Sequence, residues 1–291
     1  MAWIQFVCHT SQDKAEALSE ALSECGAAAV TFEDDADQPI YEPDPGETPL
    51  WSETRLTALF DAETEQQQVL DMLATLVDEV PRFRVEAVED KDWEREWMEN
   101  FKPIQFGDKL WIVPSWHEAP DEKAVNILLD PGLAFGTGTH ATTALCLGWL
   151  DQADLKGKYV IDYGCGSGIL AIAAALLGAE RVIGVDTDPQ ALEATRANAK
   201  RNGVEVEAYL PGDCPDALCD LLIANILAGP LQNLAPRFAN LCKADAHLVL
   251  SGVLQTQADE VAESYQSWFA MQPAAAKEDW VRLTGQRYGA K

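Results

Sequence analysis

The spacing of hydrophobic positions in residues 1–89 predicts a small domain of four strands and two helices. Two segments repeat apolar residues every three or four positions, as an amphipathic helix does, and four shorter segments have the apolar content of strands. In chain order they are a strand at 3–8, a helix at 13–25, strands at 28–32 and 55–60, a helix at 63–80 and a strand at 83–88. This order is that of a ferredoxin-like α+β domain.

Two further strands follow residue 102, and from Tyr159 the pattern changes to short apolar runs that alternate with helical segments. Strands are expected near 111–113 and 126–129, followed by strands at 159–163, 181–186, 220–224 and 247–252 and helices at 169–177, 189–202 and 231–242. Strands this short and uniformly apolar have no face for water, which favours a mostly parallel sheet covered by helices on both sides. We therefore predict a Rossmann-like, doubly wound α/β domain at 103–291, preceded by the ferredoxin-like domain at 1–89.

The segment between these domains, residues 90–102, is predicted to be a helical linker. Trp93, Trp97 and Phe101 recur at every fourth position and so share one helical face, and Pro103 then ends the helix. Such an aromatic stripe is more typical of packing between two domains than of a ligand platform. The segment is therefore also a candidate hinge.

Charge changes the picture of possible partners. The 291 residues contain 48 acidic and 21 basic side chains, a net charge of −27, and the first 100 residues alone carry −19. A bare nucleic-acid backbone is a poor partner for such a field. The acidic excess near the N-terminus serves either solubility or the docking of a basic macromolecule, and the sequence leaves both open.

Composition also limits the compartment. The hydrophobic fraction of 47% excludes global disorder, and the apolar run at 169–179 has only 11 residues, too few to cross a bilayer. The first ten residues lack the pattern of an export signal. Seven cysteines form an odd set without paired spacing, which favours free thiols in a reducing compartment. We predict a cytoplasmic protein without a membrane partner or a metal.

A glycine-rich loop follows the strand at 159–163. The sequence Asp-Tyr-Gly-Cys-Gly-Ser-Gly, residues 162–168, runs directly into a helix, and its glycines allow a sharp turn and close approach of a ligand. A nicotinamide or flavin site usually reads G-x-G-x-x-G. Here the third glycine comes one residue early, and Asp162 stands two residues before Gly164. A carboxylate at that position suits a cationic ligand group better than a diphosphate, so Asp162, Gly164 and Gly166 are predicted cofactor contacts.

A second acid completes this predicted site. Asp186 ends the next strand, 22 residues after Gly164, where a carboxylate can bind both hydroxyls of a ribose. Together the two acids call for a nucleoside with a cationic amino-acid tail, which describes S-adenosylmethionine; a nicotinamide cofactor is the alternative. Asp213, in the turn after a third strand, is predicted to approach the adenine, although Gly-Asp is also common turn chemistry.

A second glycine-rich loop occupies residues 130–140. No Lys or Arg occurs between Lys123 and Lys156, so a triphosphate-binding loop is disfavoured. We expect this loop to cover the methionine end of the cofactor, with Phe135 as an apolar lid and Thr143 as a polar contact. His140 is a candidate base, although a histidine at a helix start is more often only partly exposed.

The strand at 220–224 ends at Asn225, at the sheet edge where ligands bind. The Asn225 side-chain carbonyl, with a neighbouring main-chain carbonyl, can accept hydrogen bonds from an incoming amine and orient its lone pair. Methyltransferases of planar amines commonly follow this residue with two prolines and an aromatic, which are absent here. An aliphatic amine is therefore the favoured acceptor, with Asn225, His140 and Phe135 as candidate catalytic residues.

These motifs closely resemble the PrmA family of ribosomal protein L11 methyltransferases. The matching segments are DPGLAFGTGTH, VIDYGCGSGILAIAA, GVDTDP and ANILAGPLQNLAP, and the DWEREWM stretch and front domain agree in layout. The resemblance implies a class I methyltransferase domain joined by a helical linker to a substrate-recognition domain. It implies cofactor contacts at Thr143, Gly164, Asp186 and Asn225. Ala141 stands where many members have proline, a change that preserves the helix start.

The resemblance also implies the substrate. The family methylates lysine ε-amines and the N-terminal α-amine of ribosomal protein L11, a basic protein that we expect the acidic N-terminal domain to dock. An RNA methyltransferase, a small-molecule methyltransferase and a non-catalytic binding module are the competing interpretations. The net charge and the missing aromatic after Asn225 weigh against RNA, and the separate front domain weighs against a small free substrate. We expect a monomer that contacts no nucleic acid directly.

Overall fold

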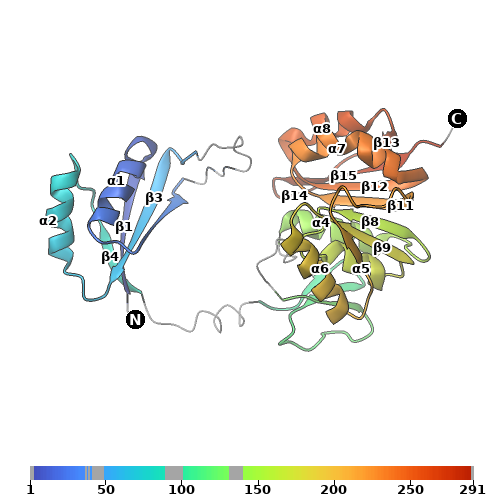
Figure 1. Cartoon of the computed structure of the whole chain (residues 1–291), viewed down its shortest axis with the longest axis horizontal. Coiled ribbons are helices and arrows are strands. Elements are labelled where there is room, and N and C mark those ends of the chain that lie inside the picture. Colours follow the sequence, from blue (N-terminus) through green and yellow to red (C-terminus); the bar gives the residue numbers. More distant parts are fainter. Residues whose placement is uncertain are drawn as a thin grey trace. The chain divides into compact units, whose positions relative to one another are not determined.

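The computed structural model describes residues 3–36, 38, 40, 49–88, 101–130 and 140–289 (Figure 1). The chain forms two compact units, Met1–Trp97 and Met98–Lys291. The predicted helical linker at 90–102 lies outside the described residues except for Phe101 and Lys102, which are not helical. The aromatic stripe predicted for that segment is therefore not tested.

The N-terminal unit is an antiparallel sheet with two helices on one face (Figure 1). Its elements are β1 (Trp3–Ser11), α1 (Gln12–Glu24), β2 (Ala29–Asp34), β3 (Glu53–Asp61), α2 (Gln66–Leu76) and β4 (Arg84–Val88). The sheet order β2-β3-β1-β4 confirms the predicted ferredoxin-like arrangement. Alternate residues of β3 are buried, because Leu56, Ala58 and Phe60 face the helices. Helix α2 ends four residues earlier than predicted.

The C-terminal unit is built on one large sheet. Its strands are β8 (Tyr159–Tyr163), β9 (Arg181–Val185), β10 (Glu207–Tyr209), β11 (Cys219–Asn225), β12 (Cys242–Leu254), β13 (Phe269–Met271), β14 (Ala275–Lys277) and β15 (Trp280–Arg287). Their order is β10-β9-β8-β11-β12-β15-β13, with β14 paired to β15. The first five strands are mutually parallel and the last three join antiparallel. The mostly parallel sheet was predicted, whereas its antiparallel end was not.

Helices cover both faces of this sheet (Figure 1). They are α4 (Ala141–Gln152), α5 (Ile169–Leu176), α6 (Pro189–Arg201), α7 (Ala228–Leu241) and α8 (Ala258–Tyr265), with a short 3-10 turn at Gln255–Gln257. One hydrophobic cluster lies between the sheet and α7 and α8, where Phe238 and Tyr265 are fully buried. A second cluster lies under α4 and α5. This two-sided burial confirms the doubly wound prediction.

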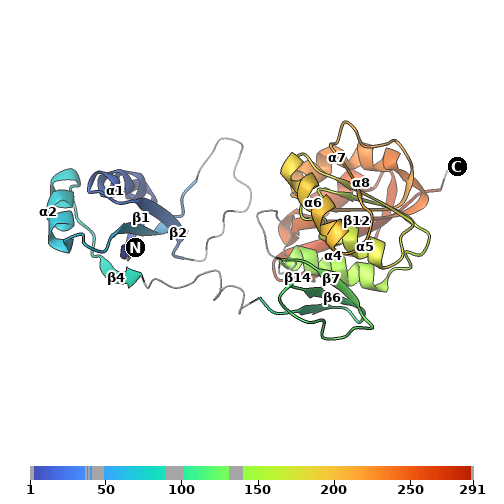
Figure 2. The same ribbon diagram turned by 60° about the horizontal axis from the view of Figure 1, so that its bottom comes forward.

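A three-stranded sheet packs beside α4 (Figure 2). It contains β5 (Ile104–Phe106), β6 (Leu110–Val113) and β7 (Val125–Leu128). The fully buried carboxylate of Asp151 holds it to α4, accepting the backbone N–H groups of Asp108 at 2.9 Å and Lys109 at 2.7 Å. The Asn202 side chain accepts the N–H of Leu128 at 2.7 Å and donates to its carbonyl at 2.9 Å, as a neighbouring strand would. The strand that precedes the second glycine-rich loop, β7, is therefore fixed by hydrogen bonds to Asn202.

The cysteines are all free thiols, as predicted. Cys219 and Cys242 lie on neighbouring strands with their sulfur atoms 3.9 Å apart. No helix among the described residues has the length and apolar character to cross a membrane. In the same part of the chain, no group of three or more histidine, cysteine or acidic residues could hold a metal ion.

Candidate functional site

The predicted site residues gather at the carboxyl edge of the parallel sheet. Asp162 lies near the end of β8, Asp186 directly follows β9, and Asn225 is the last residue of β11. Asp213 lies in the turn after β10, at the same edge. Because β10, β9, β8 and β11 run in parallel, four side chains that are far apart in the sequence share one rim.

The glycine loop has the sharply turning, left-handed backbone that its glycines allow. Gly164, Gly166 and Gly168 have φ values of +84°, +52° and +81°, which residues with side chains rarely adopt. The N–H groups of Gly164 and Cys165 both donate to the Val185 carbonyl, at 2.6 and 3.0 Å. The loop therefore lies against the end of β9 and leads into α5.

Two side chains of helix α6 donate hydrogen bonds to main-chain carbonyls of this loop. The Thr195 hydroxyl donates to the Gly166 carbonyl at 3.0 Å, and the Asn198 amide donates to the Ser167 carbonyl at 2.9 Å. Thr195 is fully buried. Sequence reasoning missed both residues, although polar side chains three positions apart on an otherwise apolar helix face were a usable signal.

Asp162 is a buried carboxyl group with one of its two oxygen atoms unpaired. It is 0% exposed, and its Oδ2 accepts the Ala171 N–H in the first turn of α5 at 3.0 Å. No donor among the described residues reaches Oδ1. Burial, reinforced by the nearby charge of Asp186, raises the pKa of Asp162 to about 7. A buried carboxylate oxygen without a donor fits a cationic N–H group of a ligand.

Asp186 braces the glycine loop and remains partly exposed. Its Oδ2 accepts the Gly166 N–H at 2.9 Å, and its Oδ1 accepts the Asp188 N–H at 3.0 Å. Each carboxylate oxygen can accept a further hydrogen bond, so the contacts leave capacity for two hydroxyls. Asp188 caps α6 by accepting the Gln190 N–H at 2.8 Å, and Pro189 occupies the first helical position.

The remaining cofactor prediction, Asp213, has an exposed side chain. Its N–H donates to the Leu210 carbonyl at 3.0 Å, which closes the turn after β10. The structure places Asp213 on the correct edge of the sheet. Its contact with an adenine stays a prediction.

Asn225 is tied to helix α4. Its Nδ2 donates to the Thr143 hydroxyl at 3.4 Å, and Thr143 is only 2% exposed. With the amide nitrogen directed to α4, the Oδ1 atom of Asn225 is the acceptor left for a ligand. Thr143 and Asn225 are 82 positions apart in the sequence, and the fold brings this predicted pair together.

His140 caps α4, and its side chain is exposed. Its Nδ1 accepts the Thr142 N–H at 3.3 Å and lies 2.8 Å from the Thr142 hydroxyl. The capping bond accounts for this histidine without catalysis, so its role as a base stays a prediction. Phe135 and residues 131–139 lie outside the described residues.

Trp280 is a residue near this site that sequence reasoning missed. It begins β15, and its ring meets the His140 ring edge-on with centroids 4.9 Å apart. The neighbouring Arg282 donates to the Leu145 carbonyl of α4 at 2.9 Å, which fixes the β14–β15 hairpin against that helix. The alternation of Trp280, Val281, Arg282 and Leu283 was a strand signal.

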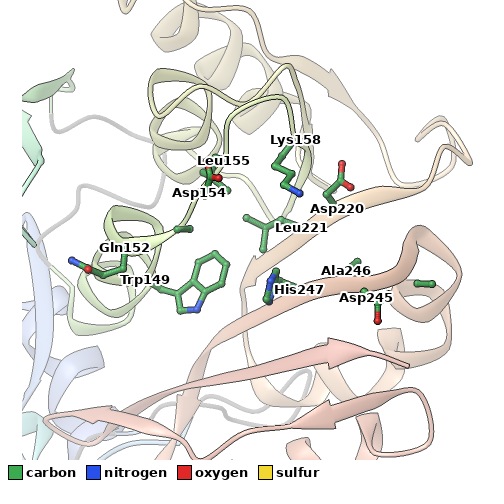
Figure 3. Close-up of a pocket in the computed structure, with 12 residues that line it drawn as sticks. Trp149, Gln152, Asp154, Leu155, Lys158, Asp220, Leu221, Asp245, Ala246 and His247 are labelled. Carbon is green, nitrogen blue, oxygen red and sulfur yellow. The ribbon is translucent and has the colours of Figure 1, made fainter. Parts of the chain in front are cut away.

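A cavity of about 550 Å³ lies at the opposite edge of the sheet (Figure 3). Trp149 and Asp154 line it from the C-terminal end of α4 and the loop that follows, and Asp220 and His247 line it from the first halves of β11 and β12. None of the predicted site residues lines this cavity. It is therefore separate from the carboxyl-edge site.

The sheet order and the placement of the glycine loop define a class of enzyme. A loop of three left-handed glycines after the central strand β8, an acid after β9 and a free buried carboxylate oxygen together fit S-adenosylmethionine, which carries a ribose and a cationic amino group. The C-terminal unit is a class I S-adenosylmethionine-dependent methyltransferase domain. The family model described as "Ribosomal protein L11 methyltransferase (PrmA)" matches residues 2–288, and the chain belongs to that family.

Curated relatives match over nearly the full length. The chain is 58% identical over 295 residues to the ribosomal protein L11 methyltransferase of Marinobacter nauticus, covering 99% of each chain. It is 56% identical over 291 residues to that of Pseudomonas paraeruginosa, again with 99% of each covered. The crystal structure of a ribosomal protein L11 methylase from Lactobacillus delbrueckii is similar with a TM-score of 0.60 and 33% identity, covering 65% of this chain and 100% of that one.

Proposed function

We propose that this enzyme transfers methyl groups from S-adenosylmethionine to lysine ε-amines and to the N-terminal α-amine of ribosomal protein L11. The observation that carries the choice of substrate is the match to enzymes named for this protein, which extends over the N-terminal unit as well as the methyltransferase domain. An enzyme acting on a small molecule would not need a separate N-terminal unit of this kind.

The carboxyl-edge residues have distinct roles in this proposal. The cofactor supplies a methyl group activated on a sulfonium, and the protein supplies alignment and excludes water. The Asp162 carboxylate would accept a hydrogen bond from the cofactor's α-amino group, and the Asp186 carboxylate would accept hydrogen bonds from its ribose hydroxyls. Asp213 would lie near its adenine. Because Gly164 and Gly166 have no side chains, the cofactor can approach the main chain of the loop closely.

Asn225 orients the acceptor amine. Its Oδ1 and the Ile226 carbonyl accept the amine N–H groups, which points the nitrogen lone pair toward the methyl group. Ile226 lies one residue before Leu227, the N-cap of α7, and the first helical hydrogen bond runs from the Leu231 N–H to the Leu227 carbonyl at 3.2 Å, so α7 itself offers the Ile226 carbonyl no donor. Leu227 is 46% exposed beside these acceptors, and its aliphatic side chain suits the stem of a lysine. Thr143, His140 and Phe135 close the site.

The acceptor must lose a proton before it reacts. A lysine with a pKa near 10.4 is neutral in about one molecule in 2,500 at pH 7, which corresponds to roughly 4.6 kcal/mol. Burial beside a positive sulfonium favours the neutral amine and lowers its pKa by several units. Desolvation therefore supplies most of what a dedicated base would supply.

The acidic N-terminal unit docks the basic substrate. Asp13, Glu16, Glu20 and Glu24 recur at helical spacing along α1, and all four side chains are exposed. Complementary charge steers a basic protein toward this helix. In this proposal residues 1–89 recognise the substrate, residues 90–102 act as a hinge and residues 103–291 carry out the chemistry, so one docked substrate can present several amines.

The enzyme works in the cytoplasm as a monomer and binds no nucleic acid directly. The free thiols support a reducing compartment, and the net charge of −27 opposes contact with RNA.

Labelled S-adenosylmethionine tests the proposal directly. The purified chain is incubated with ribosomal protein L11 or with ribosomal RNA, and intact mass and peptide mapping locate the methyl groups. We expect label on lysine and N-terminal amines of L11 and none on RNA. Label confined to RNA, or L11 that keeps its unmodified mass, would contradict the proposal.

A further inference from the structure

Ile226, the residue after Asn225, is held between two glycines. A Cβ atom built on Gly164 would lie 2.2 Å from Cγ2 of Ile226, whereas one built on Gly252 would lie 2.3 Å from the Ile226 carbonyl oxygen. Real Cβ atoms essentially never come closer than 3.0 Å to another heavy atom. With Ile226 in its present position, neither residue 164 nor residue 252 can carry a side chain.

The two glycines differ in what they touch. The Gly164 overlap is with a methyl group on the side chain of Ile226, which rotation about χ1 can move without a shift of the main chain. The Gly252 overlap is with the main chain, since the three nearest atoms are the carbonyl oxygen, the carbonyl carbon and the nitrogen of Ile226, at 2.3, 2.7 and 3.0 Å. A side chain at position 252 can be accommodated only if main chain moves, either at Ile226 or at Gly252 itself.

The backbone around Gly252 is built for this close approach. Gly252 has a φ of +84° and lies where the pairing of β12 with β15 shifts register, between Leu250 and Val253. The preceding residue, Ser251, pairs with Asn225 across β11 and β12, and its carbonyl accepts the Ile226 N–H at 3.1 Å. The irregularity in β12 thus faces the end of the strand that carries Asn225.

We propose that Gly252 is a positioning residue for methyl transfer: its missing side chain lets the main chain of Ile226 lie against β12 and so sets the direction of both amine acceptors. Those acceptors are Asn225 Oδ1 and the Ile226 carbonyl, so the inference rests on the proposed function. Apart from Asn225 and Thr143, the predicted cofactor contacts lie on β8, directly after β9, in the glycine loop and after β10, and a shift at residue 226 affects these less. Gly252 therefore governs the alignment of the acceptor more than affinity for the cofactor.

The test compares Gly252→Ala with Gly157→Ala. Gly157 has a similar φ of +71°, but a Cβ atom there meets nothing within 4 Å, so this control carries the backbone strain without the overlap. Turnover and KM are measured with ribosomal protein L11, cofactor affinity by calorimetry, and stability by thermal unfolding. We expect Gly252→Ala to lower kcat about 100-fold, as a misplacement near 1 Å can do, with cofactor affinity within about twofold of wild type. We expect Gly157→Ala to have the kcat and the cofactor affinity of the wild-type enzyme.

Gly252→Asn is the second variant, because asparagine tolerates a left-handed backbone better than alanine while its Cβ makes the same overlap. It keeps the test valid where the alanine variant folds poorly, and we expect the same selective loss of kcat. Turnover equal to that of Gly157→Ala, or kcat and cofactor affinity that fall together in both variants, would overturn the role of Gly252. Wild-type enzyme that leaves L11 unmodified would instead contradict the proposed function, and with it this inference.

Discussion

Replacing Asn225 by alanine is the sharpest test of how the acceptor amine is held. The substitution removes Oδ1, the acceptor directed away from α4, together with the contact from Nδ2 to the Thr143 hydroxyl. That contact is long, at 3.4 Å, and Asn225 is half-buried, so we expect little loss of stability. The variant should therefore fold and bind the cofactor.

The expected loss of turnover follows from the charge that develops on the amine. Its nitrogen becomes positive as the new bond forms, and a hydrogen bond to a charged group is worth about 1.5–3 kcal/mol. Losing an interaction of that size in the transition state lowers the rate roughly 10- to 150-fold. Asn225 is also a predicted cofactor contact, but Asp162 and Asp186 are untouched, so we expect cofactor affinity to change by no more than about twofold.

Single-turnover rates with ribosomal protein L11 and calorimetric titration of the cofactor measure these two quantities. Asn233→Ala is the matched control, since Asn233 is exposed on α7 and lies away from the carboxyl edge. An Asn225→Ala variant that retains the wild-type single-turnover rate would remove this residue from the mechanism. A loss of cofactor affinity as large as the loss of rate would assign it to cofactor binding instead.

Three further predictions concern Asp162, Asp151 and the charges of α1. Burial raises the pKa of Asp162 to about 7, so cofactor affinity should rise with pH through that value as the carboxylate forms, and calorimetry on Asp162→Asn should show no such rise. The same group stabilises the fold most below its unfolded pKa of 3.8, and that contribution is lost as pH rises through 7, which pH-dependent thermal unfolding of both proteins measures. Asp151→Ala leaves two backbone N–H groups without their acceptor and should cost about 2–4 kcal/mol in denaturant unfolding, whereas an unchanged midpoint would refute its role in holding the small sheet. Glu16→Lys with Glu20→Lys should raise KM for L11 in a salt-dependent way at constant kcat, while Glu205→Lys on the other unit should not; equal effects would contradict docking by α1.

The local parts of the site could be predicted because they follow from the chemistry of single segments. Only glycine adopts the backbone of Gly164, Gly166 and Gly168 at low cost, so the loop was legible in the sequence. The same holds for Asp188 and Pro189 at the start of α6, where capping requires those residue types. Periodicity likewise predicted the parallel strands, which have no wet face.

The parts that could not be predicted depend on contacts between distant segments. The sequence around Asp162 does not show that its side chain is fully buried or that its carboxylate accepts a hydrogen bond from the Ala171 N–H. Trp280 reaches His140 only because β15 pairs antiparallel with β12, a pairing that the short apolar runs do not specify. Helix α2 ends at Leu76 although its apolar spacing continues, because helix ends depend on packing as well as on periodicity.

The central claim is that the carboxyl edge of the sheet binds S-adenosylmethionine through Asp162 and Asp186. Calorimetric titration of the full chain with S-adenosylhomocysteine and, separately, with a nicotinamide dinucleotide measures this most directly. We expect the adenosyl compound to bind with one site per chain, Asp162→Asn and Asp186→Ala to weaken it, and the dinucleotide to give no heat of binding. Saturable binding of the dinucleotide, with no response to the adenosyl compound, would contradict the account.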